Sequence, residues 1–212
     1  MSPSFAPSSA RWSSASASRL ALLCRAPGLL WGCVPELHSP DGDTGGTWVA
    51  PKNTWPVSAP PDDLVGEGYS EGQVFPEFRL MDQHGDELSL WQFYGSVIVV
   101  DVSTMWCGPC AALADYVDET AAAYAAQGFV YITVLPEDNV GSVPDQEDLQ
   151  RWASDHDISQ PIVSDDLGIS YTMVPDSTWP RIMVVDRQMR IVVDRVNPVE
   201  DAAVRAAIEA NL

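Results

Sequence analysis

Two cysteines at the junction between an apolar run and a helical pattern constrain this chain more than any other feature. The run Val97–Val102 is typical of a strand buried on both faces, and Trp106-Cys107-Gly108-Pro109-Cys110 follows it. Residues 111–127, which come next, are rich in alanine and have a helical period. A strand that leads into a helix in this way places Cys107 at the helix N-terminus, where unpaired N–H groups favour a thiolate. The spacing therefore predicts a redox-active pair with Cys107 as the nucleophile.

A zinc half-site and a structural disulfide are the alternative uses of such a pair. Zinc needs two more ligands, and the sequence holds no second cysteine pair and no histidine pair at metal spacing. The other two cysteines, Cys24 and Cys33, lie in the N-terminal segment, so the globular part is not a disulfide-stapled scaffold. The redox interpretation is therefore favoured, with no metal at the pair.

The charge of the chain is strongly negative. Its 212 residues include 30 acidic and 11 basic side chains, for a net charge of −19. Arg11, Arg19 and Arg25 stand in an acid-free N-terminal segment, so the remainder carries 30 acidic and 8 basic residues. Such a surface repels nucleic acid and anionic lipid head groups, and we expect no nucleic-acid partner. The sequence holds no uninterrupted apolar run of about 18 residues, so no transmembrane helix is predicted.

Residues 1–32 are predicted to be an export signal. The first 19 residues are rich in serine and alanine, basic and acid-free, and two short apolar stretches follow. Leu30-Trp31-Gly32-Cys33 resembles a bacterial lipobox, although Trp31 departs from the usual small residue. This resemblance implies lipidation of Cys33 and a lipid-anchored protein on the periplasmic side of a bacterial membrane. A disordered N-terminal tail and an organellar transit peptide are the alternatives.

Residues 33–72 are predicted to form a flexible tether. They are rich in proline, glycine and acid without any period, a composition that favours extended, solvated chain. Trp48, Trp55 and Tyr69 are the exception. They are expected either to pack on the domain as an N-terminal strap or to stand as isolated exposed aromatics.

From residue 73 to residue 212 the pattern becomes that of one globular domain. Apolar alternation over 75–80 and 87–90 around a polar turn predicts a hairpin. The remaining elements are strands near 97–102, 129–135, 160–163, 181–186 and 190–194, and helices near 111–127, 145–156 and from Asn197 as N-cap to about 210. This order predicts an α/β fold with a central mixed β-sheet flanked by helices on both faces.

The order of elements, together with Trp106-Cys107-Gly108-Pro109-Cys110, resembles the thioredoxin superfamily. The N-terminal hairpin and the insertion at 145–163 resemble its TlpA/ResA-like, redoxin-domain branch, and the resemblance covers residues 73–212. It implies a thiol–disulfide oxidoreductase that uses no metal or organic cofactor. It also implies that Cys107 attacks the substrate disulfide and Cys110 resolves the mixed disulfide, with Gly108 and Pro109 as the thioredoxin dipeptide.

Further residues gain a role from the same resemblance. Pro180 matches the family's cis-proline, which exposes the preceding backbone to an extended substrate, although an ordinary strand-start proline is the alternative. Asp101, six residues before Cys107, has the spacing of thioredoxin's buried acid. Burial would raise its pKa and let it accept the Cys110 proton, directly or through water; the alternative is a carboxylate held by a backbone N–H. Trp106 and Trp179 are expected to flank the substrate groove or simply to pack there.

Three functions compete. The first is an exported dithiol–disulfide oxidoreductase, preferred as a reductase, which acts on disulfide-containing proteins and draws electrons from an upstream dithiol donor. The second is a peroxiredoxin-like peroxidase that uses Cys107, because Thr104 lies three residues before it, although Val100 stands where that pattern has a proline. The third is a non-enzymatic binding or copper-delivery module, which the two-residue spacing and the lack of a histidine in the C-terminal third disfavour.

Overall fold

The computed structural model describes residues 47–212. The predicted signal at 1–32, the predicted lipidation site Cys33 and the first part of the predicted tether lie outside the described residues. The strands are β1 (Arg79–Asp82), β2 (Glu87–Ser89), β3 (Val97–Val102), β4 (Phe129–Leu135), β5 (Ile162–Ser164), β6 (Arg181–Val185) and β7 (Ile191–Val193). The helices are α1 (Gly108–Ala114), α2 (Val117–Tyr124), α3 (Gln146–Asp155), α4 (Ser170–Met173) and α5 (Asp201–Glu209), with short 3-10 turns η1 (Leu90–Gln92) and η2 (Ala125–Gln127).

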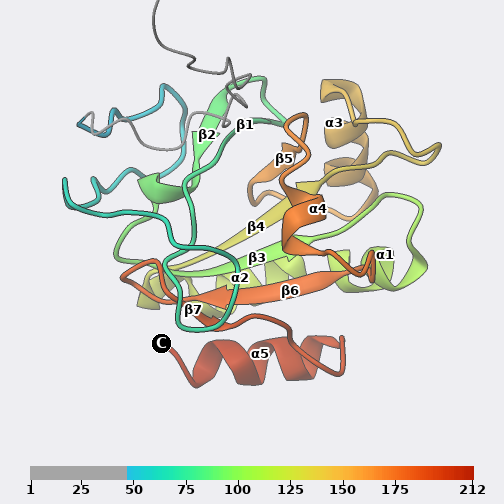
Figure 1. Cartoon of the computed structure of the whole chain (residues 1–212). Helices are drawn as coiled ribbons and strands as arrows, with labels where there is room; N and C mark the ends of the chain where they lie inside the picture. The colour runs from blue at the N-terminus through green and yellow to red at the C-terminus, as the bar shows by residue number, and fades with distance from the viewer. Residues whose placement is uncertain (1–46) are drawn as a thin grey trace, which may run out of the picture. The chain divides into compact units, whose positions relative to one another are not determined.

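The seven strands form one mixed sheet in the order β2-β1-β5-β4-β3-β6-β7 (Figure 1). The central pairs β3–β4 and β4–β5 are parallel, whereas the outer pairs are antiparallel. Every residue of β3 is buried, which is why its sequence is a continuous apolar run broken only by Asp101. The α/β architecture predicted from the sequence is confirmed.

Two hydrophobic clusters lie on the two faces of the sheet. One contains the inward residues of α1, α2, α3 and α5 together with Val97 and Val99 of β3. The other contains Ile98, Val100 and Val102 together with α4 and the N-terminal hairpin. The alternation of side chains along β3 divides the core in this way. Asp101 has the same parity as Val99 and therefore faces the layer of α1.

The helix predicted over residues 111–127 is divided into three pieces. It begins earlier, at Gly108, and stops at Ala114, where the N–H of Tyr116 bonds to the carbonyl of Leu113 in a tighter turn. It resumes as α2 and η2 and ends at Gly128, whose φ of 69° is left-handed as expected of a C-terminal glycine. The Cys-x-x-Cys pair therefore occupies a short helix of its own.

Two other boundaries differ from the prediction. The strand expected at 75–80 is shifted to β1, because the N–H of Phe75 bonds to the carbonyl of Met189 and extends the β6–β7 edge instead. The last helix begins at Asp201 with Glu200 as N-cap, not at Asn197, because its first-turn N–H groups bond to the carbonyl of Glu200. The Asn197–Pro198 peptide bond is cis.

The described part of the predicted tether is packed on the domain. The indole N–H of Trp48 donates to Glu77 at 3.0 Å and to Ser89 at 3.1 Å, and that of Trp55 donates to Asp82 at 2.6 Å. These contacts fix a segment, residues 48–58, which we call the N-terminal strap. This packing is the strap that was one of the two expectations for Trp48 and Trp55, and the carboxylates of Glu77 and Asp82 supply hydrogen-bond partners that composition does not reveal. Among residues 47–212, no helix is both long enough and apolar enough to cross a membrane.

Candidate active site

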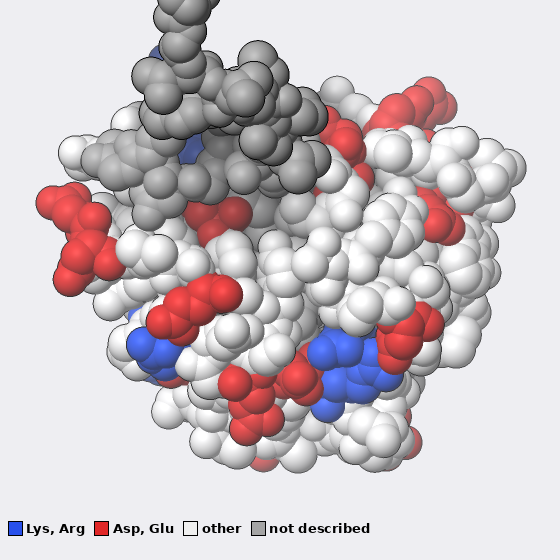
Figure 2. Space-filling view, viewed as in Figure 1, with Lys and Arg blue, Asp and Glu red and all other residues white. Residues whose placement is uncertain are grey.

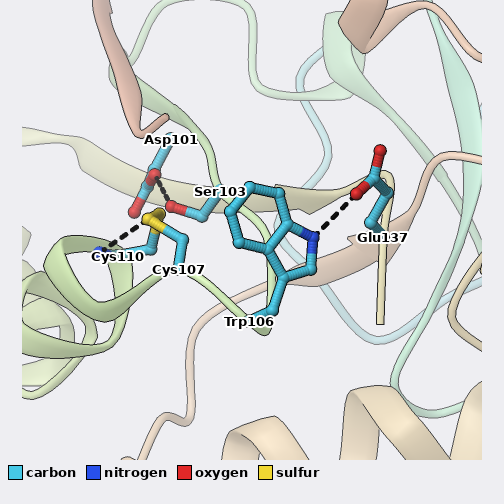
Figure 3. Close-up of a disulfide and its surroundings, with 6 residues drawn as sticks. All are labelled: Asp101, Ser103, Trp106, Cys107, Cys110 and Glu137. Carbon is cyan, nitrogen blue, oxygen red and sulfur yellow. Dashed lines mark hydrogen bonds between the residues drawn. A yellow bond between two sulfur atoms is a disulfide. The ribbon is translucent and has the colours of Figure 1, made fainter. Parts of the chain in front are cut away.

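Cys107 and Cys110 lie where the chain leaves β3 and enters α1, and they are joined in a disulfide with a Cα–Cα distance of 5.2 Å (Figure 3). Cys107 is the N-cap residue of α1, and its Sγ accepts the backbone N–H of Cys110 at 3.2 Å. Cys110 is fully buried, whereas Cys107 keeps 6% of its surface exposed. The Cys107 sulfur is therefore the more accessible of the two, and the assignment of Cys107 as nucleophile and Cys110 as resolving thiol stays a prediction.

Asp101 is buried beneath α1 with a hydroxyl donor on each carboxylate oxygen. Ser103 donates to Oδ1 at 2.5 Å, and Tyr131 of β4 donates to Oδ2 at 3.2 Å. Burial raises the pKa of Asp101 to about 6, against the two hydrogen bonds, which lower it. These partners are hydroxyls, not the backbone N–H of the alternative interpretation. Near neutral pH the carboxylate is thus charged yet close to its pKa, as suits a proton acceptor.

The Asp101 carboxylate and the Ser103 hydroxyl are directed toward the sulfur atoms in Figure 3. Ser103 and Tyr131 are not among the site residues predicted from the sequence. Ser103 stands two residues after Asp101, so in extended chain both side chains point to one face, and this signal is present in the sequence. Tyr131 needs knowledge of the register, in which Asp101 lies opposite Thr133 of β4. Burial, followed by the charge of Asp101, raises the pKa of Tyr131 well above its ordinary value, so it remains a donor.

Pro180 lies beside the disulfide loop. The Trp179–Pro180 peptide bond is cis, as the sequence predicted, and Pro180 is buried. Arg181, the next residue, pairs with Val102 at the end of β3, directly before the loop that carries the cysteines. The register of β3 and β6 therefore brings two distant motifs to the same edge of the sheet.

A carboxylate that sequence analysis missed joins the aromatic residues around the disulfide. The indole N–H of Trp106 donates to Oε2 of Glu137 at 2.7 Å, and the hydroxyl of Tyr171 donates to Oε1 at 2.8 Å. The ring of Tyr171 meets the edge of Trp179 with centroids 6.3 Å apart. Desolvation, followed by its bond to Glu137, raises the pKa of Tyr171 to about 12. We call Trp106, Glu137, Tyr171 and Trp179 the aromatic rim.

Comparisons with known proteins agree with this geometry. Residues 72–194 match the AhpC/TSA family. Over 123 residues the chain is 24% identical to thioredoxin-like protein YneN of Bacillus subtilis, covering 57% of this chain and 68% of that protein. The thioredoxin domain of a thiol-disulfide oxidoreductase from Bacteroides vulgatus superposes with a TM-score of 0.57 at 22% identity, over 66% of this chain and 96% of that one. A thiol:disulfide interchange protein from Bacteroides sp. superposes with a TM-score of 0.56 at 20% identity, over 66% of this chain and 89% of that one. These likenesses show the thioredoxin-like fold.

Proposed function

The chain belongs to the AhpC/TSA family and is a thioredoxin-like enzyme, and we propose that it reduces disulfides in exported substrate proteins. The observation that carries this proposal is the division of the cysteine pair. Cys107 is the N-cap residue of α1 and accepts an N–H bond on its sulfur, while Cys110 is fully buried and the Asp101 carboxylate is directed toward the sulfur atoms (Figure 3). The aromatic rim and the cis peptide bond before Pro180 lie beside the reactive sulfur, where an extended substrate would run.

The reaction uses two thiol–disulfide exchanges. The thiolate of reduced Cys107 attacks one sulfur of the substrate disulfide, forms a mixed disulfide and releases the other substrate sulfur as a thiolate. Cys110 then gives its proton to Asp101 and attacks the sulfur of Cys107. The second substrate thiolate leaves, and the enzyme ends with the Cys107–Cys110 disulfide. Two electrons have passed to the substrate, and an upstream dithiol donor restores the enzyme.

The direction of the reaction and the location of the protein are parts of the same proposal. The Gly108–Pro109 dipeptide, which resembles that of thioredoxin, supports a reductase rather than an oxidase. The acid-free segment at 1–32 and Leu30-Trp31-Gly32-Cys33 support export to the periplasmic side of a bacterial membrane and a lipid anchor on Cys33. Mass spectrometry of the mature N-terminus tests the anchor: a lipidated Cys33 as first residue supports it, and an unmodified chain that begins elsewhere refutes it.

Insulin reduction at neutral pH, driven by a small dithiol, tests the activity. We expect the wild-type protein to accelerate the precipitation of insulin chains and the Cys107→Ser variant to give the uncatalysed rate. Equal rates for the wild-type protein and the variant would contradict the proposal. The Cys110→Ser variant separates the two steps, because it retains attack and loses resolution.

Peroxide reduction at Cys107 is a second candidate, and Thr104 favours it. Thr104 is fully buried three residues before Cys107, and its hydroxyl has no hydrogen-bond partner among the described residues. In this reaction the thiolate attacks one peroxide oxygen, the other leaves as water or alcohol, and Cys110 displaces hydroxide from the resulting sulfenic acid. Stopped-flow tryptophan fluorescence distinguishes the candidates. Oxidation within milliseconds by micromolar peroxide would favour the peroxidase, and slow oxidation favours the disulfide reductase.

A further inference from the structure

We propose that Glu137 is a positioning residue whose carboxylate fixes Trp106 and Tyr171 as the walls of a binding site for an apolar residue next to the substrate's cysteine. The inference rests on the proposed function and deepens it, because it names a substrate class. The occupant is an extended polypeptide with an aromatic or aliphatic side chain adjacent to the cysteine that Cys107 attacks.

The first argument is geometric. One carboxylate accepts hydrogen bonds from two aromatic side chains, at 2.7 Å from Trp106 and 2.8 Å from Tyr171, so both rings are anchored to the same point. The backbone carbonyl of Glu137 also accepts the N–H of Met105 at 3.0 Å, which ties the loop after β4 to the loop that carries Cys107. Figure 3 shows the indole of Trp106 extending from beside Cys107 to this carboxylate.

The second argument is continuity along the edge of the site. Trp106 is covalently adjacent to Cys107, and Trp179 is covalently adjacent to Pro180. Tyr171, from α4, packs edge-on against Trp179 and so closes the row between them. A polypeptide that reaches the Cys107 sulfur beside the cis peptide bond must therefore pass over the aromatic rim.

The third argument concerns exposure and charge. Trp106, which precedes Cys107, is 50% exposed and Tyr171, which shares the Glu137 carboxylate with it, is 48% exposed, so each presents an uncovered ring surface. Glu137 already accepts from both rings, so its charge is engaged within the protein and is not presented as a free anion. The rim consequently favours apolar contact, and the carboxylate disfavours an acidic side chain at the same place.

Pentapeptides with a single cysteine activated as the mixed disulfide with 5-thio-2-nitrobenzoate test the inference with the reduced, full-length protein. The residue before the cysteine is Phe, Ala, Lys or Asp. We expect kcat/KM to be about fivefold higher for Phe than for Ala, mainly through KM, since an aromatic contact contributes ~0.5–1.5 kcal/mol. The Asp peptide should be the poorest substrate. Hydroxyethyl disulfide, which is too small to span the rim, serves as the reference substrate.

Three variants locate the effect. Glu137→Ala should bring the kcat/KM values of the Phe and Ala peptides within about twofold of each other. Tyr171→Phe should give an intermediate preference for Phe, because it keeps the ring and removes the hydrogen bond to Glu137. Glu137→Gln should retain most of the preference, since an amide can accept from the indole and donate to the phenol oxygen. Glu71→Gln removes the same charge at an exposed position and should match the wild-type protein. The rate of each variant with hydroxyethyl disulfide is the reference against which its peptide rates are expressed, and Glu71→Gln should reduce hydroxyethyl disulfide at the wild-type rate.

Several outcomes would overturn the inference. A Phe preference that survives in Glu137→Ala and Tyr171→Phe would mean that the rim is not the binding site. Fastest reaction of the Lys peptide would mean that the carboxylate, not the rings, is recognised. A parallel fall with hydroxyethyl disulfide would place Glu137 in the thiol chemistry itself, and a rim occupied by a second copy of the chain would appear as dimers lost in Glu137→Ala. If the wild-type protein and Cys107→Ser reduce hydroxyethyl disulfide equally slowly, the proposed function fails instead.

Discussion

The buried Asp101 carboxyl links the stability of the domain to pH. Its pKa of about 6 in the folded protein lies above the ordinary value of 3.8, so the native state binds the proton more tightly than the unfolded chain does. Stability from this group is therefore fully present below about pH 4 and is lost as pH rises through 6. At pH 8 the ionised carboxylate costs roughly 3 kcal/mol, as follows from ~1.4 kcal/mol per pKa unit.

The Asp101→Asn substitution, which removes the charge and keeps the shape, should reverse this cost. We expect urea unfolding at pH 8 to show the variant more stable than the wild-type protein by roughly 2–3 kcal/mol, with the difference disappearing near pH 4. The same variant should resolve mixed disulfides more slowly, because Cys110 loses its proton acceptor. Asp166→Asn, at an exposed position, is the control and should leave stability unchanged. A variant that is less stable at both pH values would show that burial does not penalise the charge.

The two hydroxyls on Asp101 should tune its protonation. Each donates to the carboxylate and stabilises the charged form, so removing one raises the pKa of Asp101 further. We expect the pKa of Asp101 to rise by about one unit in Ser103→Ala. The rise should be smaller in Tyr131→Phe, because the hydrogen bond that Tyr131 donates is longer than that of Ser103. The pH midpoint of Cys110 resolution, measured in single turnovers, should rise accordingly, and Ser103→Thr should restore it. Tyr124→Phe, which removes a hydroxyl bonded to Glu209 instead, is the matched control. Unchanged pH midpoints in Ser103→Ala and Tyr131→Phe would show that these hydroxyls do not influence the proton transfer from Cys110.

Spacing along the chain located the residues that belong to motifs, but not the residues that support them. The spacing of Cys107 and Cys110 after a buried strand singled out the cysteine pair, and the resemblance to thioredoxins singled out Asp101 and Pro180. Glu137 could not, since its contacts depend on how the loop after β4 folds over the cysteine loop. A lone glutamate between a strand and a loop carries no periodic signal. Its partners Trp106 and Tyr171 are 65 residues apart in sequence.

At the scale of elements, the N-terminal strap belongs energetically to the domain. Trp48 donates to Glu77, and burial, the largest cause, raises the pKa of that carboxyl while this hydrogen bond lowers it. Trp48→Phe keeps an aromatic ring but removes the donor. We expect it to lower the free energy of unfolding by about 1–2 kcal/mol without changing the rate of insulin reduction. Val49→Ala, at a residue 70% exposed, should change stability by less than about 0.5 kcal/mol. Equal effects of the two substitutions would mean that the strap contributes no stability.

The existence and type of the main elements could be predicted from periodicity, but several boundaries could not. The division of the helix at Asp115–Tyr116 leaves the helical period of the sequence intact, because both pieces bury the same face against the sheet. Composition left open whether the strap packs on the domain, because proline, glycine and acidic residues describe only the average behaviour of a segment. The hydrogen bonds from the indole N–H groups of Trp48 and Trp55 to Glu77 and Asp82 decide that it packs.

At the scale of the whole molecule, most of the few basic residues are neutralised locally. Six of the eight basic residues beyond the N-terminal segment (Arg79, Arg151, Arg181, Arg190, Arg195 and Arg205) pair with acidic side chains. On the face drawn in Figure 2, the larger blue groups of Lys and Arg atoms lie next to red groups of Asp and Glu atoms. The excess of 30 acidic residues over 11 basic ones therefore remains uncompensated. Under the proposed function, we therefore expect substrate proteins to be selected by contacts at the disulfide and the aromatic rim more than by broad attraction to an anionic surface.

Trapping a substrate on the Cys110→Ser variant tests the central claim most directly. The reduced variant is incubated with a protein disulfide such as insulin, and the covalent adduct is digested and located by mass spectrometry. Because Cys107 keeps 6% of its surface exposed and Cys110 none, we expect a stable one-to-one mixed disulfide on Cys107, while Cys107→Ser yields none on Cys110. A mixed disulfide on Cys110 in the Cys107→Ser variant, formed as readily as the adduct on Cys107, would contradict the assignment of nucleophile and resolving thiol.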